Sequence, residues 1–192
     1  MSNTVKISLK SLSLIVTFFA FISSASAQLE VGDSAPQFSA ESDAGITWYS
    51  TDYVGSNVLV VYFYPAAMTG GCTKQACAFR DDKATFDALG AMVVGVSGDE
   101  VENLVYFKEA HQLNFPLLAD PNGTIANQFG VALRDGGSIV RTVNDQEVTL
   151  ERGVTASRWT FIIDKKGKIV YKNTEVNAAE DSKATLEVIK NL

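Results

Sequence analysis

The sequence "NVLVVYFYP", residues Asn57–Pro65, is a nearly continuous run of β-branched and aromatic residues that stops at a proline. Such a run is typical of a central strand that is buried on both faces. A second run of the same kind, "AMVVGVSG", occupies residues Ala91–Gly98. We interpret both as buried strands of an α/β fold.

The segments around these two strands alternate between helical and extended patterns. Apolar spacing predicts a helix over Cys72–Gly90, with Gly90 as its stop. Further helices are predicted at Asp99–Leu113, Thr124–Gly130 and Ala178–Leu192. Further strands are predicted at Ile46–Ser50, Phe115–Asp120, Arg158–Asp164 and Lys168–Lys172, together with a hairpin over Ser138–Gly153 that turns at Asn144–Asp145. Residues Val31–Ser42 form an extended lead-in, and the whole order predicts an α/β sandwich with a mixed sheet.

The first 27 of the 192 residues resemble a signal peptide. Lys6 and Lys10 precede an apolar stretch, Ser11–Ile22, which is shorter than the ~20 residues that span a bilayer. The small residues of Ser23–Ala27 then provide an Ala-x-Ala cleavage pattern. We expect cleavage after Ala27 and export to the periplasm, to the outside of the cell or to an organelle lumen. An uncleaved membrane anchor is the alternative.

The expected mature chain, residues 28–192, has the size of a single domain. It holds 14 basic and 22 acidic residues, a net charge of −8, because Lys6 and Lys10 are lost with the leader. An acidic protein repels phosphate backbones and anionic lipids. Nucleic acids and membranes are therefore not expected as partners of the mature chain.

Cys72 and Cys77 are the two cysteines of the chain. On one helix, five positions correspond to a rise of ~7.5 Å and a rotation of ~500°, which places the Cα atoms ~8.5 Å apart. A disulfide needs less than ~7 Å, so a bridge would require the helix to unwind. A purely structural bridge is disfavoured because so short a loop loses little entropy on closure. Zinc is disfavoured because it takes four ligands and His111 is the only histidine. Thiols that open and close the bond are the leading interpretation.

The two cysteines are predicted to play different parts. Cys72 follows "TGG" and stands at the start of the predicted helix. A helix N-terminus favours an anion by about 0.3–1 kcal/mol, and a nearby arginine would favour the thiolate further. Cys72 is therefore predicted to be the attacking thiol, and Cys77, deeper in the helix, the second thiol.

The segment "YFYPAAMTGGCTKQACAFRD" resembles the active-site segment of peroxiredoxins, the AhpC/TSA-type proteins, and in particular the branch called peroxiredoxin Q or bacterioferritin comigratory protein. That family carries Pro-x-x-x-Thr-x-x-Cys, which Pro65, Thr69 and Cys72 match. The branch often places a second cysteine five residues later, here Cys77. The family's active-site arginine precedes a strand of the form R-x-T-F-x-I-D, which makes it Arg158 in "RWTFIID".

The resemblance extends from about residue 31 to residue 189 and includes "FPLLADPNGTIANQFGV" at Phe115–Val131. Three features depart from it. Gly70–Gly71 stands where many members have Pro-Gly, and Gln75 stands where many have Glu. The hairpin at residues 138–153 is longer than the usual connection.

The resemblance implies a single peroxiredoxin domain with a thioredoxin-like fold: a central mixed β-sheet flanked by helices, with extra N-terminal strands. It implies that Cys72 reduces hydrogen peroxide and organic hydroperoxides through a sulfenic acid, and that Cys77 then forms the Cys72–Cys77 disulfide. A thioredoxin-like or other dithiol reductant restores the thiols. Thr69 and Arg158 would stabilise the transition state, and Pro65 would shape the loop and shield the sulfur. The resemblance implies no cofactor and no metal.

Two other functions are left open by the residues alone. A general exported thiol–disulfide oxidoreductase would normally carry Cys-x-x-Cys, which this sequence lacks. An exported binding module with a passive disulfide would hold a bond that resists thioredoxin-type reductants. A monomer is expected because both thiols lie in one chain.

Overall fold

Five strands form the central sheet, in the order β5-β4-β3-β8-β9. β3 (Val58–Phe63) lies in the middle, and β4 (Ala91–Ser97) and β5 (Leu117–Ala119) continue from it as parallel neighbours. On its other side, β8 (Trp159–Ile163) pairs antiparallel with β3, and β9 (Ile169–Asn173) pairs antiparallel with β8. The mixed sheet expected from the sequence is confirmed.

The computed structural model describes Met1, residues 28–143 and residues 145–192. Except for Met1, the predicted signal peptide at residues 1–27 lies outside the described residues. In the part of the chain that is described, no helix has both the length and the apolar character that a membrane crossing requires.

All six residues of β3 are buried, as its unbroken apolar run predicts. Because successive side chains of a strand point to opposite faces, the run supplies two cores at once. Val60 and Tyr62 join one core, while Leu59 and Val61 join the other. Full burial of a side chain of this size contributes about 1.5–3 kcal/mol, so β3 anchors both layers.

Helices cover the first face of the sheet, and they pack on the core that contains Val60 and Tyr62. These helices are α1 (Gly70–Asp81), α2 (Lys83–Ala88), α3 (Val101–His111) and α5 (Asp181–Ile189). Phe79 of α1 is fully buried there and stacks on Tyr62 with ring centroids 4.8 Å apart. The site described below is therefore built on a helix that is fixed against the central strand.

The second face is covered by smaller elements. Two short N-terminal strands pair antiparallel into a sheet of their own, followed by a 3-10 turn, and α4 lies beside them. The bounds are β1 Ser39–Glu41, β2 Thr47–Tyr49, the 3-10 turn Ser50–Asp52, and α4 Thr124–Gln128. The extra N-terminal strands expected from the family resemblance are thus present.

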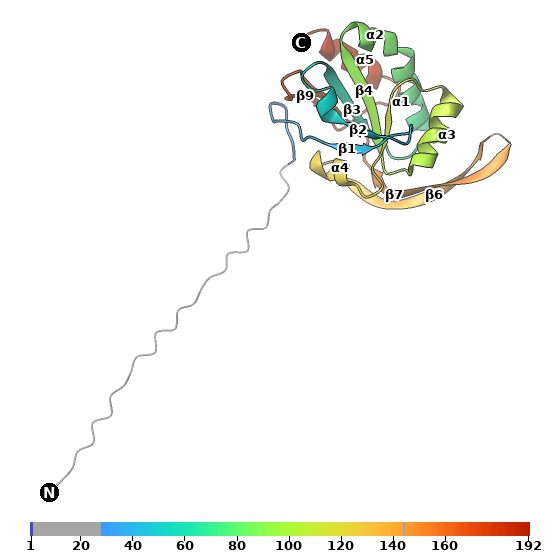
Figure 1. The fold of residues 1–192 in the computed structure, drawn as a ribbon, viewed down its shortest axis with the longest axis horizontal. Helices are drawn as coiled ribbons and strands as arrows, with labels where there is room; N and C mark the ends of the chain where they lie inside the picture. The colour runs from blue at the N-terminus through green and yellow to red at the C-terminus, as the bar shows by residue number, and fades with distance from the viewer. Residues whose placement is uncertain (2–27, 144) are drawn as a thin grey trace.

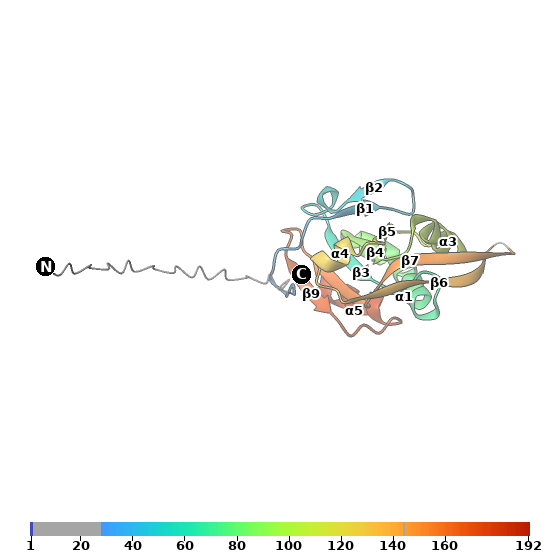
Figure 2. The same cartoon turned by 90° about the horizontal axis from the view of Figure 1, so that it is seen from below.

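β6 (Leu133–Val143) and β7 (Gln146–Ala156) pair into a separate two-stranded ribbon. The ribbon extends past the body of the molecule in both views (Figures 1 and 2). It is longer at both ends than the hairpin predicted over residues 138–153. At its base, Gly153 N–H donates to Gly98 O at 3.0 Å. A Cβ on Gly98 would lie 2.1 Å from Val154 O, so only glycine permits this close approach.

All four predicted helices differ from their predicted bounds: α4 and α5 are shorter than expected, and for the other two a hydrogen bond accompanies the difference. The helix predicted over residues 72–90 is interrupted at Asp82, which is the C-cap of α1 and has a φ of −90° and a ψ of 0°. Ser182 Oγ of α5 donates to the Asp82 carboxylate at 2.7 Å, so a tertiary contact accompanies the break. The helix predicted over residues 99–113 begins at Val101, because Asp99 turns into the interior to accept other hydrogen bonds.

Candidate active site

The loop that joins β3 to α1 is held by one hydrogen bond within the loop and by two from other parts of the chain. Ala67 N–H donates to the buried Asp99 carboxylate at 2.8 Å, and the Thr69 hydroxyl donates to Ala66 O at 2.9 Å. Arg141 Nε of the ribbon donates to Met68 O at 2.9 Å. Pro65, the first loop residue after Tyr64, is half-buried.

Met68 shows that this loop is under backbone strain. Its φ of 59° lies in the left-handed region, which a residue with a Cβ rarely adopts. Such residues persist only where their surroundings impose the conformation, and they concentrate at functional sites. Here the contacts on either side of Met68, at Ala67 and Thr69, impose it.

Cys72 lies in the first turn of α1, two residues after its first residue, Gly70. The residue before the helix, Thr69, is the N-cap, and its side chain does not cap the helix. The backbone N–H groups of this first turn have no partner within the helix and point toward the N-terminal end. Cys72 is only 1% exposed, so water screens the interaction of its sulfur with these partial charges poorly.

Arg158 donates from Nη2 to Cys72 Sγ at 3.3 Å. The strand register explains how a residue 86 positions away reaches the sulfur. Phe63, the last residue of β3, pairs with Trp159, the first residue of β8. Arg158 therefore stands directly beside the loop that leads into α1. A Cβ on Gly71 would lie 3.3 Å from Arg158 Nη2, so glycine also leaves room for the guanidinium.

A buried polar chain continues from Arg158 to the start of α5. Arg158 Nη1 donates to Gln75 Oε1, and Gln75 Nε2 donates to Asp181 Oδ2 at 2.7 Å. Thr160 Oγ1 of β8 donates to the same carboxylate oxygen at 2.7 Å. Burial raises the pKa of Asp181, and the hydrogen bonds from Thr160 and Gln75 and the charge of Arg158 only partly oppose this.

Cys77 lies further along α1 and is half-buried. Both cysteines are free thiols, and the helix is continuous from Gly70 to Asp81. The premise of the spacing argument, that both cysteines lie on one helix, is confirmed. A bond between the two sulfurs therefore requires the first turns of α1 to unwind.

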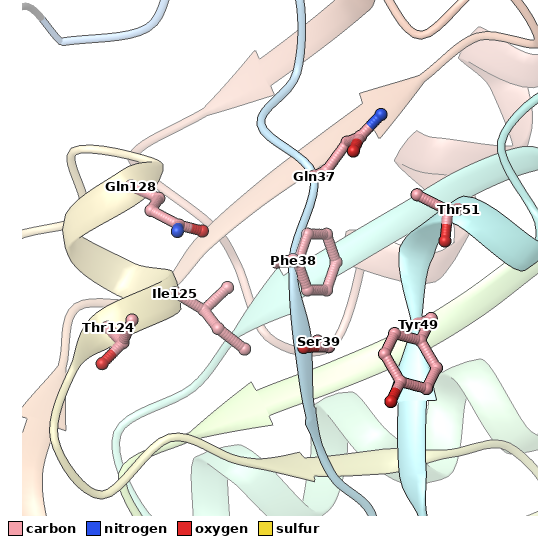
Figure 3. Close-up of a pocket in the computed structure, with 8 residues that line it drawn as sticks. All are labelled: Gln37, Phe38, Ser39, Tyr49, Thr51, Thr124, Ile125 and Gln128. Carbon is pink, nitrogen blue, oxygen red and sulfur yellow. The ribbon is translucent and has the colours of Figure 1, made fainter.

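Two further features bear on what the site can hold. Among the described residues, no cluster of three or more His, Cys, Asp or Glu side chains could bind a metal ion. A separate pocket of about 440 Å³ is lined by residues from β1 and the segment before it, from β2 and from α4, among them Phe38, Tyr49 and Gln128 (Figure 3). Its eight lining residues include neither cysteine nor an Asp, Glu, Lys, Arg or His side chain.

The structure brings together three of the five site residues predicted from the sequence, namely Cys72, Arg158 and Thr69 at the same helix end. Cys77 lies on the same helix, and Pro65 begins the loop. Sequence reasoning missed Asp181, which lies within the helix predicted over residues 178–192. It noted Gln75 only as a departure from a pattern. No local sequence signal identifies this pair, because their contact joins residues 106 positions apart.

Comparisons with known proteins place this chain among related proteins. Residues 31–172 match the model of the AhpC/TSA family. Peroxiredoxin Bcp of Bacillus subtilis is 34% identical over 164 residues, covering 85% of this chain and 97% of the relative. The chloroplastic peroxiredoxin Q of Populus jackii is 34% identical over 168 residues, covering 86% of this chain and 70% of the relative. The crystal structure of peroxidoxin BcpB from Mycobacterium tuberculosis superposes with a TM-score of 0.72 at 30% identity, covering 86% and 99% of the two chains.

The buried Asp99 carboxylate that holds the loop gives a pH-dependent prediction. Burial raises its pKa above the ordinary 3.8, although Ala67 N–H, Ser97 and Asn103 donate to it. The folded state therefore binds this proton more tightly than the unfolded state. The protonated Asp99 carboxyl therefore contributes stability at a pH below its ordinary pKa. This contribution is lost as the pH rises through the pKa of Asp99 in the folded state. Asp99→Asn keeps an oxygen for Ala67 and removes the titration.

We expect the unfolding free energy of the wild type, minus that of Asp99→Asn, to fall as pH rises from about 3.5 to about 7. Urea unfolding of both proteins across this range measures the difference. A difference that stays constant or grows with pH would contradict the assignment of the raised pKa to Asp99.

Proposed function

Because this chain belongs to the AhpC/TSA family and is a peroxiredoxin of the Bcp and peroxiredoxin Q type, we propose that it reduces hydrogen peroxide and organic hydroperoxides at Cys72 and passes the oxidation to Cys77. Peroxiredoxins are thiol-dependent peroxidases, and the chain is therefore an oxidoreductase. The family assignment supports a peroxidase over the other two functions considered above, a general thiol–disulfide oxidoreductase and a passive binding module.

The observation that carries the proposal is the 3.3 Å contact between Arg158 Nη2 and Cys72 Sγ. A positive guanidinium and a helix N-terminus both favour the thiolate, which is the nucleophilic form. Within the described part of the chain, no carboxylate pairs with Arg158 directly. Its full charge therefore faces the sulfur and the peroxide that approaches it.

Thiolate formation alone does not make a fast peroxidase. An ordinary cysteine is only about 3% ionised at pH 7, so full ionisation gains about thirtyfold. Groups that stabilise the stretched O–O bond must supply the rest. Arg158 is placed to donate to the peroxide oxygens as their charge grows. The Thr69 hydroxyl gives its proton to Ala66 O, so its oxygen is left to accept a hydrogen bond from the peroxide O–H. Pro65 shapes the loop around them.

The proposed catalytic cycle has three chemical steps. The Cys72 thiolate attacks one peroxide oxygen, the O–O bond breaks, and the leaving oxygen takes a proton to depart as water or alcohol. Cys72 becomes a sulfenic acid. The Cys77 thiol then displaces its hydroxyl as water and forms the Cys72–Cys77 disulfide. A thioredoxin-like or other dithiol reductant supplies two electrons and two protons to restore both thiols.

The second step requires a different conformation from the first. Cys72 is buried and Cys77 is half-buried on a continuous helix, so the first turns of α1 must unwind before the sulfurs can meet. Unwinding also exposes the disulfide to the dithiol reductant. Both thiols belong to one chain, and we propose that the enzyme works as a monomer, which sedimentation of the reduced protein would test.

Variants of the two cysteines should separate the two chemical steps. We expect Cys72→Ser to abolish the reaction with peroxide, because it removes the nucleophile. Cys77→Ser should keep the first attack and lose turnover with a dithiol, because no second thiol resolves the sulfenic acid. Stopped-flow mixing with hydrogen peroxide, followed by chemical trapping of the sulfenic acid, measures both. Loss of the first step in Cys77→Ser, or fast peroxide reduction by Cys72→Ser, would contradict the assigned roles.

Removal of the Arg158 guanidinium should affect more than ionisation. We expect Arg158→Ala to lower the second-order rate with peroxide by about 100- to 1,000-fold, even at a pH where the thiolate is fully formed. Rates measured across a pH series, with thiolate absorbance recorded in parallel, isolate the two effects. Arg134→Ala on the exposed part of β6 is the matched control and should retain the wild-type rate. If Arg158→Ala changes only the ionisation, Arg158 has no role in the transition state.

The enzyme is also proposed to act after export, because residues 1–27 have the order of a signal peptide: Lys6 and Lys10, an apolar stretch and an Ala-x-Ala site. The periplasm is the proposed location, with another exported compartment as the alternative. Mass spectrometry of the protein purified from its own cells should find Gln28 as the first residue. An intact leader on the active protein would refute this.

A further inference from the structure

A buried carboxylate lies two hydrogen bonds behind Arg158. Asp181 is 2% exposed, Gln75 and Thr160 are fully buried, and together they connect the start of α5 to the Arg158 guanidinium. The chain of contacts ends at the Cys72 sulfur. The guanidinium itself contacts two residues of α1, Cys72 and Gln75, and Gln75 is held in turn by Asp181 of α5. Thr160 of β8 donates to the same Asp181 carboxylate.

Hydrogen-bond chemistry allows only one orientation of the Gln75 amide. An ionised carboxylate only accepts hydrogen bonds, and a guanidinium only donates them. The amide must therefore turn its NH₂ group to Asp181 and its carbonyl oxygen to Arg158, as the contacts show. The opposite orientation would place the NH₂ group against the guanidinium and leave buried donors unpaired, at a cost of about 1–3 kcal/mol for each.

In this arrangement the Arg158 guanidinium is oriented without having its charge neutralised by a carboxylate in direct contact. A carboxylate in direct contact with Arg158 would hold the guanidinium in place but would also compensate its charge. Here the group in contact is the neutral Gln75 amide, and the carboxylate stands behind it. Arg158 is thus fixed while its charge stays available to Cys72.

The stability of the fold does not explain why the Asp181 carboxylate is buried. Asp181 Oδ1 has no hydrogen-bond partner among the described residues, although it is shielded from water. A buried acid that is only half satisfied lowers the stability of a fold. Burial also raises the pKa of Asp181, as expected for a carboxylate with a desolvated oxygen. Costs of this kind are typical of functional positions.

We propose that Asp181 is a positioning residue for peroxide reduction: through the Gln75 amide, it fixes the Arg158 guanidinium against the Cys72 sulfur. Asp181 itself does not touch the sulfur, and its effect passes entirely through Arg158. This inference rests on the proposed peroxidase function of Cys72 and Arg158.

The test is a double-mutant cycle on the first chemical step. Asp181→Leu removes the acceptor and keeps the number and branching of the side-chain heavy atoms, so Gln75 can turn and Arg158 is no longer held. We expect the second-order rate with hydrogen peroxide to fall about 10- to 100-fold, as for a misplaced catalytic group. In an Arg158→Ala background the same change should have almost no further effect, because the residue through which Asp181 acts is already absent.

Two more variants keep the test decisive. Asp181→Asn still offers an oxygen to Gln75 and Thr160, so it should restore part of the rate lost in Asp181→Leu. If Asp181→Leu does not fold, as judged by far- and near-ultraviolet circular dichroism, Gln75→Leu breaks the same chain from α1 and should give the same loss and the same non-additivity with Arg158→Ala.

The outcomes distinguish this inference from the proposed function. If the wild-type protein does not react with peroxide, the proposed function fails. If the wild type reacts and Asp181→Leu keeps its rate, or if the losses from Asp181→Leu and Arg158→Ala multiply, the positioning role alone is overturned. Non-additive losses with partial recovery in Asp181→Asn support it.

Discussion

The pairing of β3 with β8 is the constraint on which the site depends. Phe63 and Trp159 are opposite each other in an antiparallel register, so the chain that leaves β3 and the chain that enters β8 meet at one edge of the sheet. That edge carries the first turn of α1 on one side and Arg158 on the other. A slip of one residue would send the side chains of β8 to the opposite faces of the sheet. Burial of β3 on both faces makes such a slip costly.

The two halves of the proposed cycle make opposite demands on α1. Attack on peroxide needs a wound first turn, because the N–H groups and Arg158 stabilise the thiolate only in that geometry. Disulfide formation needs the same turn to unwind, because a continuous helix keeps the thiols of Cys72 and Cys77 apart. The contacts of Gln75 with Arg158 and Asp181 belong to the wound state. The balance between the two states is therefore set by the same hydrogen bonds that arrange the site for catalysis.

The loop before α1 shows how the structure holds a strained segment in place. Met68 has a left-handed backbone, and its carbonyl accepts a hydrogen bond from Arg141 of the ribbon. The Asp99 carboxylate accepts a hydrogen bond from the N–H of the preceding residue, Ala67. The ribbon, which the family resemblance does not explain, thus contacts the active-site loop directly. Burial raises the pKa of both Asp99 and Asp181, and the hydrogen bonds of both carboxylates support this one region.

Much of the fold follows from patterns within the sequence. The apolar run of β3 predicts a strand buried on both faces, which the structure contains, and the motif around Pro65, Thr69 and Cys72 predicts Cys72 as the nucleophile. Helix ends were less predictable: the helix expected over residues 72–90 breaks at Asp82, where Ser182 of α5 donates to its carboxylate. Only the tertiary structure decided how Arg158 is held, because Gln75 and Asp181 lie 106 positions apart and meet only after α1 and α5 pack on the sheet. Periodicity and motif spacing record contacts within one element, whereas hydrogen bonds between distant elements exist only once the fold has brought them together.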